Sequence, residues 1–263
     1  MRIVSDVAHA TAFLTCLPVP ARAFGGSRLD FARQSWAFPL VAAPLAAMAG
    51  AACWAALALF GSASAAGIFV VGTLALLTGA LHEDGLADCA DGFWGGHEPA
   101  RRMAIMRDSA IGTYGVVALI VLFALRVEAV RALLLRFDLF AFAALLLATV
   151  AFGRTALILP WALTSPAPRG DDGAKGESLA SRFGRPDGKQ ALLASAACFV
   201  LLVPASFASG LLTLIGAVAL GGAAALLAAR TAHAKIGGHT GDTLGATVLL
   251  AETGFLFGAL AST

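Results

Sequence analysis

Long apolar runs alternate with shorter polar segments along almost the whole chain. A membrane-spanning helix needs about 20 consecutive, mostly apolar residues. Seven runs approach that length: residues 37–60, 64–82, 114–135, 139–163, 190–208, 210–229 and 244–262. The pattern therefore predicts an all-α fold, a polytopic integral membrane helix bundle with about seven transmembrane helices. Counts of six or eight are left open.

The N-terminal run at residues 3–17 differs from the other seven because it is shorter and more polar. Asp6 and His9 interrupt it, and Pro18 and Pro20 follow it and would end a helix. We expect an interfacial or re-entrant helix there. The interruptions also argue against a secretory signal peptide, since no clean small-residue cleavage site follows them.

Composition agrees with this interpretation. The chain of 263 residues is 59% hydrophobic and only 13% charged, whereas soluble domains carry about 25% charged residues. We expect a single integral membrane domain over residues 1–263. The four cysteines are far apart and form no Cys-x-x-Cys pair, so we expect them to be free and packed; they are Cys16, Cys53, Cys89 and Cys198.

The charges favour one side of the membrane. Fourteen of the eighteen Lys and Arg residues fall within residues 1–36, 83–113, 164–189 and 230–243. With the spans above, these four segments share a side, which the positive-inside rule makes cytoplasmic. We expect a multi-pass protein of the cell inner membrane with its active site on the cytoplasmic face.

The segment HEDGLADCADG at residues 82–92 is the most unusual polar stretch. Glu83, Asp84, Asp88 and Asp91 lie within nine residues, and no Lys or Arg occurs between Gln34 and Ala100. Two unit charges ~5 Å apart at an effective dielectric constant of ~20 repel each other by roughly 3 kcal/mol. A hard divalent cation, which takes oxygen ligands, would relieve this repulsion.

Helical spacing supports a metal site at these acids. At about 100° per residue, Asp84, Asp88 and Asp91 lie within about 60° of one another, and Glu83 lies at the edge of that face. We predict a hard divalent cation as the cofactor, bound by these four carboxylates. The alternative is a solvated acidic turn between two membrane helices.

Three arginines follow the acids in the segment 95–115. Cations beside metal-binding carboxylates suit a phosphate ester or a diphosphate. We therefore name Arg101, Arg102 and Arg107 as candidates for substrate binding, with Asp108 beside them. The alternative for each arginine is the positive-inside rule alone, which asks for cations here regardless of function.

A second glycine-rich segment, KIGGHTGDTLGA at residues 235–246, precedes the last apolar run. Such a turn can expose backbone amides to an anion. Asp242 is a further candidate metal ligand. The alternative is a plain helix N-cap formed by Asp242 or Thr243.

Ionisable residues within predicted spans are candidates for function by default. Arg126, Glu128 and Arg131 could pair with one another along one helix. Arg154 lies in the cytoplasmic half of its span and is a candidate for substrate binding. For Glu252 we leave open a deeper metal ligand, a partner for Arg154 or a structural polar contact.

The chain resembles the cobalamin synthase family, the adenosylcobinamide-GDP ribazoletransferases, over nearly its full length. The resemblance rests on FLTCLPVP at residues 13–20, SWAFPLV at 35–41, HEDGLADCADGFWGG with RRMAIMRDSAIGTYG, and GGHTGDTLGA. One departure is visible: the family usually has Lys before the Asp-Ser pair, where this chain has Arg107, which keeps the charge.

The resemblance implies a late step of coenzyme B12 biosynthesis. α-Ribazole or its 5′-phosphate is joined to adenosylcobinamide-GDP, GMP is released, and adenosylcobalamin or its 5′-phosphate is formed. It also implies a divalent metal, usually magnesium, with the family's acidic motif on Glu83, Asp84, Asp88 and Asp91. The chain has no recognisable protein nucleophile, so a substrate hydroxyl would attack. Glu83, His82 and His239 are the candidates for the catalytic base.

Two other functions were weighed. A CDP-alcohol-type membrane phosphotransferase would use similar acids, but its motif has Ala-Arg after the first Asp-Gly, where this chain has Leu86-Ala87. A divalent-cation transporter would need acids deep in several spans, and here only Glu128 and Glu252 are deep. The expected partners are the two substrates and the lipid bilayer, with no nucleic acid; a homo-oligomer is left open.

Overall fold

The computed structural model describes residues 2–26, 29–168 and 183–262. Within them every regular element is helical, and the only β-type pairing is an isolated bridge between Pro166 and His239. In chain order the helices are α1 (Arg2–Leu14), η1 (Ala21–Phe24), α2 (Phe31–Gln34), η2 (Ser35–Val41), α3 (Ala42–Phe60), α4 (Ala63–Leu77), α5 (Leu81–Gly95), α6 (Pro99–Met106), α7 (Thr113–Arg136), α8 (Leu139–Ala156), α9 (Ile158–Leu163), α11 (Gly188–Ser209), α12 (Leu211–Ile236) and α13 (Gly241–Ala261). The all-α prediction is confirmed.

Five helical stretches of the described chain are long and apolar enough to cross a membrane, or six if the bent pair α4 and α5 counts as one span. This agrees with a multi-pass helical membrane protein, although the count is below the expected seven. The helix in the expected span 114–135, α7, is not among them. It carries four ionisable side chains in its last eleven residues: Arg126, Glu128, Arg131 and Arg136.

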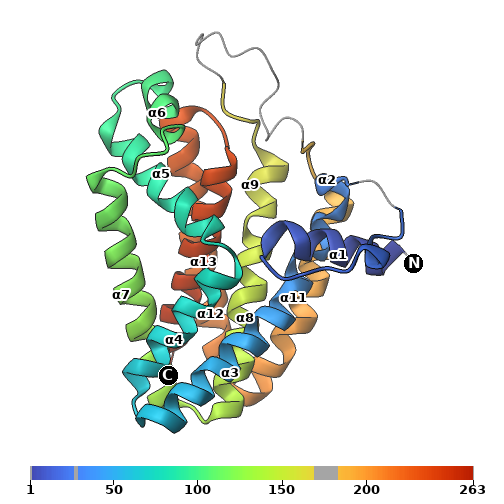
Figure 1. Cartoon of the computed structure of the whole chain (residues 1–263), viewed down its shortest axis with the longest axis vertical. Helices are drawn as coiled ribbons and strands as arrows, with labels where there is room; N and C mark the ends of the chain where they lie inside the picture. Colours follow the sequence, from blue (N-terminus) through green and yellow to red (C-terminus); the bar gives the residue numbers. More distant parts are fainter. Residues whose placement is uncertain (1, 27–28, 169–182, 263) are drawn as a thin grey trace.

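The predicted span 64–82 is wrong as a single helix. Helix α4 stops at Leu77, and α5 leaves it at 91°. Gly79 (φ 62°) and Ala80 (φ 55°) at the break have left-handed backbone conformations that a helix cannot continue through. The acidic segment is therefore a separate helix that begins inside the bundle (Figure 1).

The long helices run roughly along the longest axis of the molecule (Figure 1). At one end lie α6 and the turn between α12 and α13; the C-terminus lies near the other end. Helix α1 lies across the direction of the long helices instead of running along them (Figure 1). It is held by Asp6, whose carboxylate accepts hydrogen bonds from Arg33 (2.9 and 3.2 Å) and from Nε1 of Trp36 (3.1 Å).

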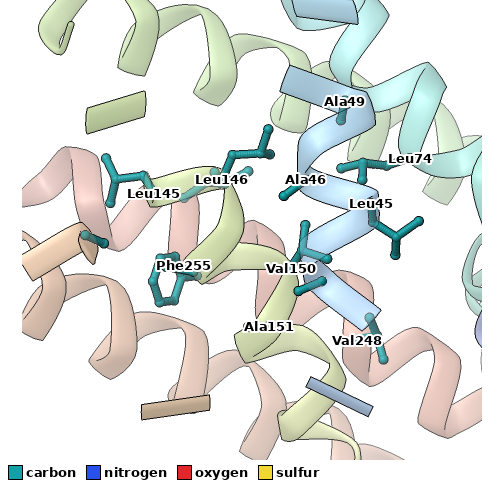
Figure 2. Close-up of a cluster of buried hydrophobic side chains, with 14 of the residues drawn as sticks. Leu45, Ala46, Ala49, Leu74, Leu145, Leu146, Val150, Ala151, Val248 and Phe255 are labelled. Atoms are coloured by element: carbon teal, nitrogen blue, oxygen red, sulfur yellow. The ribbon is translucent and has the colours of Figure 1, made fainter. Parts of the chain in front are cut away.

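The core is made of small and branched apolar side chains from α3, α4, α8 and α13, and Figure 2 shows one cluster of them around Leu45, Val150 and Phe255. Helix α12 approaches α13 through glycines: a Cβ on Gly258 would lie 2.2 Å from the carbonyl oxygen of Gly216. Such small-residue contacts let membrane helices pack closely. As a result α13, which carries Asp242 and Glu252, is fixed within the bundle.

All four cysteines are free, as predicted. Three of them are buried, but Cys16 is exposed, so the expectation of a packed side chain is wrong there. Cys16 follows the end of α1, where the chain has left the helix and lies against the α4–α5 break.

Candidate active site

Helix α5 places the acidic residues as the spacing predicts. It is continuous from Leu81 to Gly95, so Asp84, Asp88 and Asp91 follow one another along one face. Asp84 is exposed, Asp88 is half-buried and Asp91 is buried. The acidic face therefore becomes more buried from Asp84 towards Asp91.

Helix α13 brings Asp242 to the same face. Gly85 makes this possible, because a Cβ there would lie 2.7 Å from the carbonyl oxygen of Asp242. The charge on Asp242 acts on Asp88, and the charge on Asp84 acts on Asp242. Two helices that are distant in sequence thus contribute to one acidic group.

The N-cap alternative for Asp242 is not what the structure shows. Thr240 caps α13 in a reciprocal capping box with Thr243. Asp242 accepts only a long hydrogen bond, 3.3 Å, from the Thr240 hydroxyl. Its carboxylate is therefore not used to start the helix and remains available as an oxygen ligand.

The donor chemistry of this group suits a hard divalent cation. Within the described part of the chain, the carboxylates of Asp84 and Asp88 have no hydrogen-bond or ion-pair partner. Carboxylate oxygens are the ligands that Mg²⁺ prefers. As the side chains stand, however, no three His, Cys, Asp or Glu residues in the described ranges form a ready-made metal group. Asp84, Asp88 and Asp242 are the residues that would hold the ion.

Asp91 has a second task that the sequence did not reveal. Its two carboxylate oxygens accept hydrogen bonds from the backbone N–H groups of Gly112 (2.7 Å) and Gly115 (2.9 Å) at the start of α7. A Cβ on either glycine would lie 2.5 Å from an Asp91 oxygen. Asp91 thus anchors the segment that follows the arginines, whether or not it also contacts a metal.

Glu83 and His82 are both buried. Oε2 of Glu83 and both ring nitrogens of His82 have no hydrogen-bond partner in the described structure. The charges of Arg126 and Arg154 act on both side chains. The structure therefore groups Glu83 and His82 with the buried arginines, and the assignment of Glu83 as a metal ligand stays a prediction.

The two arginines share one buried carboxylate. Nη2 of Arg126 donates to Oε2 of Glu252 at 2.8 Å, and Nη1 of Arg154 donates to Oε1. Glu252 is therefore a partner of Arg154, one of the three roles left open for it. Pairing of Glu128 with Arg131 is confirmed (2.7 Å), but the prediction that Arg126 joins them is wrong, because it lies on the buried side of α7.

The remaining substrate-binding candidates lie around α6. Arg101, Arg107 and Asp108 are exposed at the polar end of the bundle. Arg102 is partly occupied: its guanidinium donates to the carbonyl oxygens of Gly96 (3.0 Å) and Lys235 (2.7 Å), which ties α6 to the end of α12. Substrate contact by these residues remains a prediction.

His239 lies in the turn before α13 and is held by Thr164, which the sequence gave no reason to choose. Its Nδ1 is 2.9 Å from the Thr164 hydroxyl, and its backbone pairs with residues 165–167. Nε2 is buried and has no partner among the described residues. Burial, with a smaller effect from the positive charge of Arg185, lowers the pKa of His239 below its usual value. The ring is therefore neutral at pH 7 and can accept a proton.

Fold and site together define a multi-pass helical membrane protein with an acidic, oxygen-donor group at its polar end. The model of the cobalamin-5-phosphate synthase family matches residues 6–260, so the chain belongs to that family. It is 40% identical to the adenosylcobinamide-GDP ribazoletransferase of Sinorhizobium medicae, with 97% of this chain and 95% of that protein covered. It is 42% identical to the protein of the same name from Rhizobium meliloti, with the same coverage. The protein of that name from Brucella anthropi is 36% identical over 97% of this chain and 96% of its own length. No solved structure matches the chain.

Proposed function

We propose that this protein is the membrane enzyme that joins α-ribazole or its 5′-phosphate to adenosylcobinamide-GDP and releases GMP. The observation that carries the proposal is membership of the family across residues 6–260, together with curated relatives that bear the name of this activity. The acidic group on α5 and α13 is the feature of the chain that suits chemistry on a diphosphate.

The chemistry is the transfer of a phosphoryl-linked group from GMP to a ribose hydroxyl. A bound divalent metal would polarise phosphoryl oxygens and neutralise charge on the leaving group. Asp84, Asp88 and Asp242 would hold that ion. The protein's own work is then to position two large substrates and to accept one proton.

His239 is the best-placed base among the candidates. Its Nε2 is free in the described structure, and Thr164 fixes the ring through Nδ1. His82 and Glu83 are also buried, but the charges of Arg126 and Arg154 act on both of them. We assign them to the support of the site and assign the proton transfer to His239.

We also propose that the protein lies in the inner membrane and that its active site is on the cytoplasmic face. Support comes from the distribution of charge: Arg101, Arg102 and Arg107 lie around α6, and Arg230 and Lys235 lie towards the C-terminal end of α12. The turns at Gly61 and Gly210, which follow the C-terminal ends of α3 and α11, carry no charge. A cytoplasmic site would give direct access to nucleotide substrates.

The test is product formation by the purified full-length protein in detergent or vesicles. With adenosylcobinamide-GDP, α-ribazole and Mg²⁺, we expect adenosylcobalamin and GMP in equal amounts, and no GMP without α-ribazole. CMP release from CDP-diacylglycerol, with no corrinoid product, would instead indicate a CDP-alcohol-type phosphotransferase. Absence of both products from a folded preparation would contradict the proposal.

A further inference from the structure

An open pocket of about 480 Å³ lies where the end of α1 meets the break between α4 and α5. Phe13, Thr15 and Cys16 form one wall, residues 78–81 form the other, and Asp84 lies at its edge. The pocket therefore opens beside the exposed end of the acidic face. Its volume falls in the range of small-ligand sites, about 300–1,000 Å³.

The two walls are joined by specific contacts. The backbone N–H of Cys16 donates to the carbonyl oxygen of Leu77 at 2.8 Å, and a Cβ on Gly79 would lie 2.7 Å from Sγ of Cys16. Ala80 has a positive φ of 55°, a conformation that costs an L-residue energy and that clusters at functional sites. The chain thus maintains an unfavourable backbone to shape this wall.

The lining indicates which part of a substrate fits. Among the described residues no Lys or Arg lines the pocket, and Asp84 adds a negative charge, so a phosphate would be repelled there. Phe13 supplies an aromatic surface, and its ring is held in place by Phe31 (ring centroids 4.3 Å apart) and Phe183 (5.7 Å). A pre-positioned aromatic side chain beside small polar residues suits a planar, uncharged ring.

We propose that this pocket binds the heteroaromatic base of a nucleoside substrate, with the sugar and phosphate directed past Asp84 to the acidic group. The proposal rests on the proposed function, which supplies two such bases: the guanine of adenosylcobinamide-GDP and the benzimidazole of α-ribazole. Both share the chemistry that the pocket recognises, and the experiment separates them.

Cys16 is a built-in reporter, because it lines the pocket and is the one exposed cysteine, the other three being buried. The rate at which an uncharged maleimide modifies Cys16 is measured on the full-length protein with Mg²⁺ and GMP, α-ribazole or ribose 5-phosphate. The Cys16→Ser variant shows the background from the buried thiols. We expect GMP or α-ribazole to slow labelling by about tenfold or more at saturation, and ribose 5-phosphate, which lacks a base, to have no effect.

A second variant does not depend on the thiol. Phe13→Leu removes the aromatic face but keeps most of the apolar volume. Phe13→Leu should raise KM by roughly tenfold for the substrate whose base occupies the pocket, with kcat little changed. This is the size expected when one base–aromatic stack is lost. Phe207 is exposed near the C-terminal end of α11. Phe207→Leu is therefore the matched control and should behave as wild type.

If the enzyme turns over but neither GMP nor α-ribazole slows the labelling of Cys16, and KM is unchanged in Phe13→Leu, the assignment of the pocket is overturned and the proposed function stands. If GMP or α-ribazole slows the labelling of Cys16 in a folded protein that shows no turnover, the assignment of the pocket stands and the proposed function is overturned.

Discussion

Glu252 on α13 accepts a hydrogen bond from Arg126 on α7, with 2.8 Å between Oε2 and Nη2, while its other oxygen pairs with Arg154 on α8. None of the three residues is more than 4% exposed. Gly153 makes room for the carboxylate, since a Cβ there would lie 2.5 Å from Cγ of Glu252. This pair of ion pairs joins α7, α8 and α13.

Removing one partner should therefore be costly. Glu252→Gln leaves two buried guanidinium groups without a counter-charge, and breaking a buried pair in this way typically costs about 3–5 kcal/mol of stability. We expect a large drop in the thermal unfolding midpoint of the detergent-solubilised protein. Replacing Arg126, Arg154 and Glu252 together by Met should restore much of it, because no unpaired charge is then left.

Glu128→Gln is the control for that measurement. Glu128 pairs with Arg131 on the exposed side of α7, the helix that carries Arg126, and an exposed ion pair contributes little to stability. Its unfolding midpoint should match that of wild type. A Glu252→Gln protein as stable as Glu128→Gln would contradict the structural importance of the buried pairs.

A second prediction concerns Asp91 and the start of α7. Gly115→Ala places a methyl group 2.5 Å from an Asp91 oxygen, so the backbone contact must open. We expect a loss of about 1–3 kcal/mol of stability, typical of overpacking, and reduced turnover. Gly72→Ala in α4, where a Cβ meets nothing within 4 Å, should be neutral or slightly stabilising. Equal behaviour of the two variants would argue against the contact.

A third prediction concerns the pH dependence of turnover. The pKa of His239 is lowered first by burial and then by the nearby Arg185, so the neutral base persists to a lower pH than for an ordinary histidine. Removing that positive charge in Arg185→Gln makes protonation easier and raises the pKa. The acid limb of the kcat/KM profile should then move to higher pH.

Lys189→Gln, an exposed change of the same charge at the start of α11, should leave that limb in place. An unchanged acid limb in both variants, or full activity in His239→Gln, would exclude His239 as the base.

Some of this could be read from the sequence, for reasons that particular residues make clear. Helix α5 and its acidic face follow from local spacing, and the position of Asp242 at the start of a helix follows from a glycine-rich turn before an apolar run. The break at Gly79 and Ala80 could not be read, because a single glycine in an apolar segment is compatible with a continuous helix.

Long-range partners were the least predictable. Arg126 was matched to Glu128 because both lie on one helix, whereas its true partner, Glu252, is 126 residues away and is selected by packing. Thr164 and His239 are 75 residues apart, and their contact likewise depends on the fold.

A fourth prediction tests the orientation in the membrane. In a Cys16→Ser background, cysteines introduced at Gly95 and Gly241, where a Cβ meets no close contact, should react with an impermeant thiol reagent only from the cytoplasmic side. A cysteine at Ser209 should react only from the other side. If Gly95→Cys and Gly241→Cys are labelled from opposite sides, the end of α5 and the start of α13 lie on different sides of the membrane. That result would contradict a single acidic group formed by both helices.

The most direct test of the central claim is the metal dependence of GMP release from adenosylcobinamide-GDP in the presence of α-ribazole. We expect no release in the presence of a chelator, recovery with Mg²⁺ or Mn²⁺, and a loss of at least ~100-fold in Asp84→Asn, Asp88→Asn and Asp242→Asn proteins that fold normally. Glu98→Gln, an exposed acid just before α6, should keep wild-type activity. Undiminished GMP release in the three aspartate variants at limiting metal would contradict the assignment of these carboxylates as the metal site.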